Sequence, residues 1–282
     1  MNDLAEERLS EAKVSATFSS MLKHWRKHHK QSQLDLSLEA GISQRHLSFL
    51  ESARAKPSRE MVLNLASAME LPLRERNGLL HVAGFAPVFK ERNLDSEEMS
   101  AVQKALKMSL SHHEPYPALV ADRNWNLLMA NDASLKLIGL LGDPEDVWAR
   151  VDPSGLKNIY RMTFHPEGMQ PLIGNWDVLA RHLFLRLQRE LSADPGNEYL
   201  SQLLLEVCEW SDFELVPKAI DVMQALTPVV PMELSAGGAT LKVFSMISSF
   251  GTALDITAEE LKVETFFPAD DFTAQFFRRL AD

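Results

Sequence analysis

The chain has 282 residues, of which 45% are hydrophobic, and it carries a formal net charge of -10 and one cysteine, Cys208. This length favours two domains, and a single cysteine excludes an intramolecular disulfide and a zinc site built from several cysteines. The first 17 residues are charged and polar and no apolar run approaches the roughly 20 residues of a membrane span, so we expect a cytoplasmic protein without a membrane partner.

The negative charge is unevenly divided along the chain. Residues 1–90 hold 13 Lys and Arg against 10 Asp and Glu, whereas residues 91–282 hold 16 against 29. Within residues 18–60 the count is 8 basic against 4 acidic side chains. Because salt confines the field of an exposed charge to about 10 Å at 0.1 M, this basic region can attract phosphate groups although the whole chain is acidic.

Five helices are predicted over residues 18–84, after a polar extension over residues 1–17. The first helix carries Phe18, Leu22 and Trp25 on one apolar stripe, with Arg26 among the basic side chains on its other faces. Residues 57–69 and 73–83 form two later helices of this module. Residues 85–95 then read as a linker to the second domain.

Two short helices joined by a tight turn are predicted over residues 31–58. Ser32 and Asp35 form a capping box at the start of the first, and Gly41 supplies the positive φ that the turn favours. Ser43 is then the N-cap of a second helix, whose Leu47 and Leu50 face the core. The first turn of that helix exposes polar side chains, as reading a major groove requires: Gln44, Arg45 and His46.

This segment resembles the helix-turn-helix of Cro/C1 repressors, the XRE type. Two positions depart from the family: Ser37 stands where Ala is usual, and Ala53 where Gly is frequent. The resemblance implies a phosphate contact at Gln33 and base or backbone contacts at the exposed first turn. Arg can pair with guanine and Gln with adenine, while other basic side chains hold phosphates. The predicted DNA-binding residues are Arg26, Gln33, Ser43, Gln44, Arg45, His46, Arg54 and Lys56.

A mixed helical and strand pattern follows over residues 96–282. A helix begins near Ser96, and residues 118–130 form two short strands around a polar turn. Helices are predicted at 132–141, 176–190 and 198–209. Strands return at 229–234, at 241–248 after a turn at Gly237 and Gly238, and at 261–267, before a helix at 271–280. The fold class is therefore all-α for the first domain and α+β with an antiparallel sheet, PAS-like in its element order, for the second.

Over nearly its whole length the chain resembles the MmyB-like regulators, which join an XRE-type helix-turn-helix to a PAS-like ligand-binding domain. The resemblance is carried by RHLSFLE, LPLRERNGLLHVAGFAPVF, HEPYPALV, Asn131, FHPEG at 164–168 and GTALDITAEELKVETFFPAD. The resemblance implies a small-molecule site in the second domain. Part of the resemblance points to a fatty-acid-like ligand for that site. No other cofactor is expected.

An apolar pocket between the sheet and its helices is therefore expected. Asn131 and His165 are its polar candidates, and Arg181 could pair with an anionic head group. Each apolar member could equally be plain core, and His165 could only hold the turn made with Pro166 and Gly168. The predicted ligand-binding residues are Trp125, Met129, Asn131, Phe164, His165, Trp176, Leu179, Arg181, Leu183, Phe244 and Met246.

The sequence is interpreted as a transcription regulator rather than an enzyme. It has no Gly-rich phosphate loop, nucleophile elbow or metal-spaced cluster of His and carboxylates. We expect a homodimer on a palindromic operator, with an apolar effector that shifts it between DNA-binding and non-binding states. Two alternatives stay open: an antitoxin-like protein that binds a protein partner and no small molecule, and a haem- or redox-sensing PAS regulator with His165 or His182 as ligand.

Overall fold

The computed structural model describes residues 17–211, 229–236 and 238–281. The predicted extension over residues 1–17 therefore lies almost entirely outside the described residues, as does Gly237 of the predicted turn. By their contacts the residues form two compact units. The first unit comprises residues up to Arg92 together with Gly251–Glu259, and the second comprises Asn93–Phe250 and Glu260 onward. The predicted domain boundaries did not include this return of the chain to the first unit.

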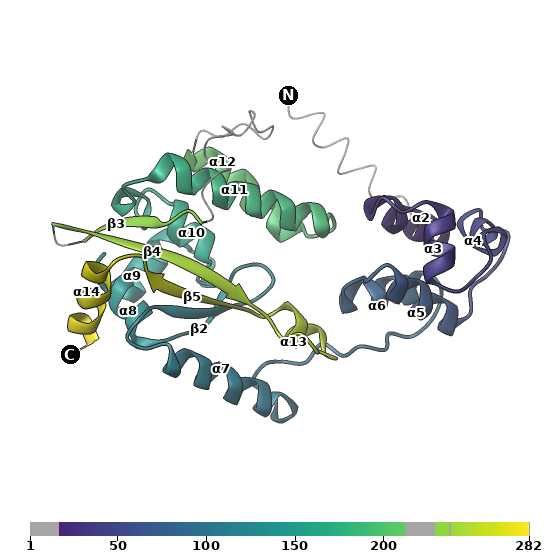
Figure 1. The fold of residues 1–282 in the computed structure, drawn as a ribbon, viewed down its shortest axis with the longest axis horizontal. Helices are drawn as coiled ribbons and strands as arrows, with labels where there is room; N and C mark the ends of the chain where they lie inside the picture. The colour runs from purple at the N-terminus through teal and green to yellow at the C-terminus, as the bar shows by residue number, and fades with distance from the viewer. Residues whose placement is uncertain (1–16, 212–228, 237, 282) are drawn as a thin grey trace. The chain divides into compact units, whose positions relative to one another are not determined.

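The first unit contains the five helices that the sequence predicts, drawn in purple and blue in Figure 1. Buried side chains from all five, among them Leu22, Leu47 and Leu65, form one hydrophobic core. The helices span α2 (Phe18–His28), α3 (Gln33–Glu39), α4 (Gln44–Glu51), α5 (Arg59–Ala68) and α6 (Leu73–Val82).

The first unit also contains residues from the connection between the two last strands of the sheet. Asp255 accepts a hydrogen bond from Arg92 at 2.7 Å, and the N–H of Ile256 donates to the carbonyl of Lys90 at 2.9 Å. The short helix α13 (Ile256–Glu260) begins at this point. Its Thr257 hydroxyl donates to the carbonyl of Arg92 at 2.6 Å. The segment after the fifth helix is thus paired with residues about 160 positions later in the chain.

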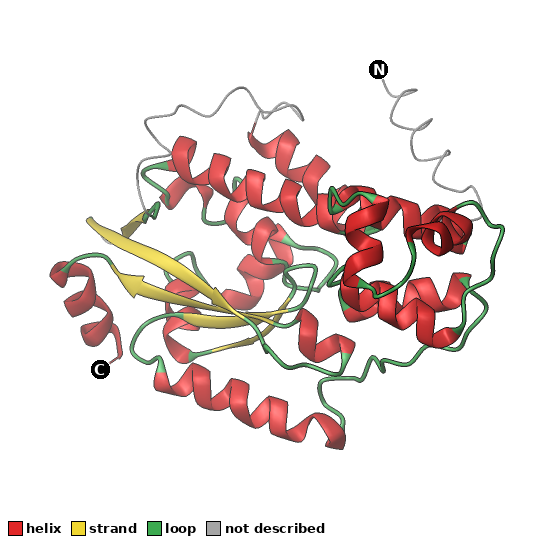
Figure 2. Cartoon of the chain, turned by 45° about the vertical axis from the view of Figure 1, so that its right-hand side comes forward, coloured by secondary structure: helices red, strands yellow, loops and turns green. Residues whose placement is uncertain are grey.

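The second unit is built on a five-stranded antiparallel sheet of order β2-β1-β5-β4-β3, yellow in Figure 2. The predicted hairpin and the predicted three-strand meander are both present, joined by the pairing of β1 with β5. The strands span β1 (Ala118–Ala121), β2 (Leu127–Ala130), β3 (Met232–Ala236), β4 (Ala239–Ser248) and β5 (Lys262–Pro268).

Helices cover both faces of this sheet (Figure 1). On β1, Ala118 and Val120 pack toward α7 on one face, whereas Leu119 and Ala121 pack toward α10, α11 and α12 on the other. Successive side chains of a strand point to opposite faces, so both sets are buried at once. The helical elements are η1 (Glu97–Met99), α7 (Ser100–His112), α8 (Asp132–Gly139), α9 (Pro144–Val151), α10 (Ile159–Phe164), η2 (Gln170–Leu172), α11 (Trp176–Ala193), α12 (Glu198–Ser211) and α14 (Asp271–Ala281).

None of the helices in the described part of the chain is long and apolar enough to span a membrane.

Candidate functional site

The helix pair α3 and α4 has the local geometry that its sequence predicts. Ser32 and Asp35 form the reciprocal capping box, with hydrogen bonds of 3.1 and 2.9 Å. Gly41 adopts φ +64° between the helices, a conformation that costs glycine no Cβ clash. The hydroxyl of Ser43 accepts a hydrogen bond from the N–H of His46 and so caps α4. The starts of both helices and the turn between them are therefore stabilised by residues within the segment itself.

The first turn of α4 presents three polar side chains to solvent, those of Gln44, Arg45 and His46. On the opposite face of the helix, Leu47 and Leu50 are fully buried in the core. The guanidinium of Arg45 lies 5.3 Å from the centre of the Phe49 ring on its own helix. An exposed polar turn on a firmly buried helix is the geometry with which a recognition helix enters the major groove.

Arg26 differs from the expectation that it faces outward like the other basic residues of α2. It is only 8% exposed, because its guanidinium is held in place by Glu51 at the end of α4. Two hydrogen bonds, from Nε at 2.6 Å and Nη2 at 2.9 Å, reach that carboxylate, and Nη1 donates to the carbonyl of Gln31. Gln33 adds a fourth, from its amide to Glu51 at 2.8 Å. This network fixes α2 and the start of α3 against α4.

Glu51 is ionised within that network. Burial raises the pKa of its carboxyl group, but the hydrogen bonds from Arg26 and Gln33 and the charge of Arg26 outweigh burial, so the pKa lies below its ordinary value. Arg54 and Lys56, which follow α4, are exposed. Between them and the helix, Ala53 adopts φ +57°, the left-handed conformation that glycine tolerates best.

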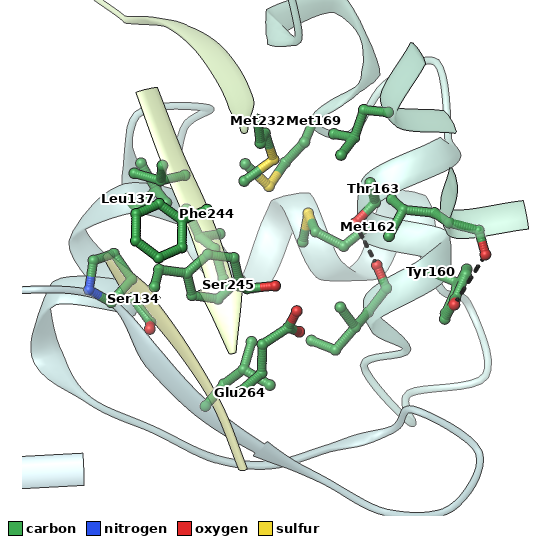
Figure 3. A pocket seen from close by; sticks show the side chains of 18 of the residues that line it. Ser134, Leu137, Tyr160, Met162, Thr163, Met169, Met232, Phe244, Ser245 and Glu264 are labelled. Atoms are coloured by element: carbon green, nitrogen blue, oxygen red, sulfur yellow. Dashed lines mark hydrogen bonds between the residues drawn. The ribbon is translucent and has the colours of Figure 1, made fainter. Parts of the chain in front are cut away.

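A cavity of about 120 Å³ lies in the second unit, on the face of the sheet covered by α10 and α11 (Figure 3). Most of its lining is apolar, and three methionines, Met162, Met169 and Met232, contribute to it. The lining residues are Pro117, Leu119, Ser134, Leu137, Ile138, Trp148, Ile159, Tyr160, Met162, Thr163, Met169, Leu179, Leu183, Arg186, Val230, Met232, Val243, Phe244, Ser245, Glu264 and Phe266.

The sheet register explains which strand residues reach this cavity. Leu119 on β1 pairs with Glu264 on β5, and Phe266 pairs with Ser245 on β4, so these four side chains share one face. Glu264 is 4% exposed although it is a carboxylate, whereas Ser245 is exposed. Figure 3 shows both pointing toward the middle of the pocket.

Tyr160 and Arg186 also border the cavity. The hydroxyl of Tyr160 donates to the carbonyl of Leu183 at 3.2 Å and accepts from Nε of Arg186 at 3.0 Å. Burial raises the pKa of Tyr160, so the hydroxyl stays neutral. Arg186 in turn places Nη1 3.7 Å from Oε1 of Glu264.

Trp125 organises the charged groups behind this wall of the pocket. The guanidinium of Arg186 and the ammonium of Lys262 lie 4.2 and 4.3 Å from the centre of its ring. Its indole N–H donates to Glu190 at 2.7 Å, and Lys262 donates to the same carboxylate oxygen at 2.6 Å. Burial lowers the pKa of Lys262 although Glu190 opposes that shift. Trp125 is thus a structural residue behind the cavity rather than part of its lining.

Three of the predicted ligand-binding residues line the pocket: Leu179, Leu183 and Phe244. The other apolar candidates have places elsewhere. Met129 packs in the core on the opposite face of the sheet, and Met246 is 59% exposed. Phe164 and Trp176 contact each other edge to face in the core.

The predicted polar candidates also lie outside the pocket lining. Asn131 is the N-cap of α8, where its side-chain oxygen Oδ1 accepts hydrogen bonds from the main-chain N–H groups of Ser134 and Ala118. His165 accepts a hydrogen bond from the N–H of Glu167 within its own turn. Arg181 is partly exposed on α11 and does not line the cavity.

The polar pocket residues that sequence reasoning missed are Ser134, Tyr160, Thr163, Arg186, Ser245 and Glu264. The sequence contained a signal for Glu264, because this charged residue stands in the same strand as Val263, Phe266 and Phe267. Both faces of that strand are covered by helices. The sequence alone does not show which residues of α10 and α11 face that carboxylate. Among the described residues, no group of His, Cys, Asp and Glu side chains could hold a metal ion.

Two family models match the segments in which the α4 turn and the cavity lie. The family model described as MmyB-like transcription regulator ligand binding domain matches residues 102–280, and the model described as Helix-turn-helix matches residues 22–76. The first match contains every residue of the pocket, and the second contains α3, α4 and the exposed turn. No curated protein matches the chain.

Proposed function

Because this chain belongs to the MmyB-like transcription regulators, as a DNA-binding regulator with a ligand-binding domain, we propose that its pocket binds a small apolar effector that controls DNA binding. The observation that carries the proposal is the cavity between the sheet and α10 and α11. Its wall is mostly apolar with a few convergent polar groups, which is the usual composition of a small-molecule site. The three methionines supply adaptable side chains on one wall.

The size of the cavity limits what enters it without rearrangement. At about 120 Å³ it is comparable with an engineered protein cavity of about 150 Å³ that binds benzene. A ring-sized group, or a segment of a short acyl chain, fits this space. A long fatty-acid chain therefore requires the methionine-lined wall to move.

DNA recognition is assigned to the exposed turn of α4. In this proposal Gln44, Arg45 and His46 read base edges or adjacent phosphates, and Arg54 and Lys56 hold phosphates. Arg26 orients Glu51 and Gln33 beneath that surface. The protein acts in the cytoplasm as a homodimer on a palindromic operator, since two-fold symmetry doubles the footprint of one recognition helix.

The experiment is native mass spectrometry of the purified full chain, beside a denatured and solvent-extracted sample. A co-purifying apolar compound would then be added to the stripped protein in an operator-binding titration. We expect the compound to change operator affinity, because an effector acts by binding the two states unequally. The effector proposal is contradicted if the protein carries no compound and its intrinsic tryptophan fluorescence, to which the pocket residue Trp148 contributes, responds to no apolar probe. DNA binding would be unaffected by that result.

A further inference from the structure

Glu264 is a buried residue whose carboxylate faces the pocket and accepts no hydrogen bond from the residues that the structure describes. Its side chain is 6% exposed, and its ion-pair partner among the described residues is Arg186, with Nη1 3.7 Å from Oε1. At that distance the charge of Arg186 compensates the charge of Glu264, but the two groups are too far apart for a hydrogen bond. Buried polar groups in proteins are nearly always hydrogen-bonded, and leaving a charged one unsatisfied is costly.

In this arrangement the neighbouring cations that the structure describes make no hydrogen bond to Glu264, and Nη1 of Arg186 lies 3.7 Å from its carboxylate. Glu190 takes the hydrogen bonds of both Lys262 and the Trp125 indole, and Arg186 directs Nε to the hydroxyl of Tyr160. The two cations and two carboxylates of this cluster also balance each other. The pocket therefore presents an acceptor whose charge is compensated and whose lone pairs are free of protein donors within the described residues.

We propose that the effector is an apolar compound with a neutral O–H or N–H donor, an alcohol or an amide, and that this donor binds Glu264. The inference rests on the proposed function of the pocket as an effector site. A carboxylate head group at this position would lie beside a like charge with no added cation. An ammonium group would meet Arg186 at close range. A neutral donor satisfies the carboxylate and disturbs neither balance.

Ser245 supports this placement of the head group. It lies on the same face of the sheet as Glu264, one strand away, and Figure 3 shows both side chains pointing into the same space. Its exposed hydroxyl both donates and accepts, so it can complete the contacts of an alcohol or an amide. The apolar part of the ligand then lies toward Met162, Met169 and Met232.

The test compares ligands that differ only in their head group: 1-octanol, octanamide and octanoate, added to the full chain at pH 7. Binding is measured by calorimetry and by intrinsic tryptophan fluorescence, to which the pocket residue Trp148 contributes. We expect the alcohol and the amide to bind at least about tenfold more tightly than octanoate, because only the neutral head groups donate a hydrogen bond to the Glu264 carboxylate. The variant Glu264→Gln, which keeps the shape but not the charge, should reduce that preference to about threefold or less.

Glu233→Gln is the matched control, because Glu233 pairs with Lys242 on the sheet and does not line the pocket. It should leave the preference unchanged. If the wild-type protein binds octanoate as tightly as the neutral ligands, the inference is overturned while the pocket remains an effector site. If no octyl ligand binds, and no apolar compound is extracted from the purified protein, the proposed effector function fails as well. The wild-type comparison decides the inference even where a variant does not fold.

Discussion

The main-chain N–H of Leu73 donates a 2.7 Å hydrogen bond to Oε2 of Glu259, a residue 186 positions later. Leu73 is the first residue of α6, and the residue before it, Pro72, makes no side-chain cap. The first N–H groups of a helix need acceptors from outside the helix, and a carboxylate is also favoured there by the helix dipole. The connection between β4 and β5 thus completes a helix of the first unit.

We expect Glu259→Ala to destabilise the first unit by about 1 kcal/mol, the usual effect of removing an N-cap. The measurement is hydrogen exchange at the amides of α6. Glu259→Gln keeps an acceptor oxygen at the same place and should lose less. Equal exchange in all three proteins would show that the hydrogen bond contributes nothing to stability.

The network around Glu51 predicts a dependence of stability on pH. Since its pKa is lowered by folding, Glu51 stabilises the protein above the pKa of the unfolded chain, near 4.3, and this contribution is lost as pH falls through the lowered folded value. The stability difference between wild type and Glu51→Gln should therefore be largest at pH 7 and shrink toward zero in acid. Urea unfolding followed by circular dichroism measures it, with the exposed Glu167→Gln as control.

Removing Arg26 should be more damaging than removing an exposed arginine. The variant Arg26→Ala leaves Glu51 buried without its counter-charge, for which we expect a loss of about 3 kcal/mol. Arg279→Ala, on the exposed face of α14, provides the comparison and should change stability by less than about 0.5 kcal/mol. Similar unfolding midpoints for the two variants would contradict a structural role for Arg26.

Ala53 predicts a stabilising substitution. Its φ of +57° costs an alanine roughly 1 to 2 kcal/mol that glycine does not lose, and part of this gain is offset by the entropy of glycine in the unfolded chain. We expect Ala53→Gly to raise stability by about 0.5 to 1 kcal/mol. Ala101→Gly, in the exposed part of α7, should lower it by a similar amount. Thermal unfolding of the two variants distinguishes the expected gain in stability of Ala53→Gly from the expected loss of Ala101→Gly.

Arg45 is the best single test of sequence reading. If it donates to one base, Arg45→Ala should relax the preference at one operator position by about 1 to 3 kcal/mol. Replacing Lys56 with Ala should instead weaken binding to all sequences and reduce its salt dependence. The comparison uses selection from a randomised DNA pool. An unchanged binding motif for the Arg45 variant would remove it from the base-reading residues.

The sequence predicted the helix-turn-helix better than the pocket, for a physical reason. Gly41, Ser43 and the capping box act within a few residues of one another, so their roles can be read from spacing. Glu264 and Arg186 meet only because the sheet and α11 pack together, and no local pattern encodes that contact. The same holds for Arg26, whose basic character suggested a phosphate contact until its partner 25 residues later was known.

Asn131 shows a second limit of prediction from sequence. Asn131 follows β2 and is part of the family resemblance, and the sequence predicts that it contacts the ligand. The structure uses its amide to hold the start of α8 against β1, through Ala118 and Ser134. A buried amide that caps a helix and bonds a strand satisfies its own hydrogen-bonding capacity and leaves little for a ligand.

The return of residues 251–259 to the first unit has a practical consequence for dissecting the protein. The chain passes between the two units three times, after Arg92, after Phe250 and after Glu259. An expression fragment that stops at residue 92 would lack the partners of Lys90, Arg92 and Leu73. The DNA-reading unit therefore cannot be cut from the chain at residue 92 without losing these contacts. A fusion protein that carries this unit must also contain residues 251–259.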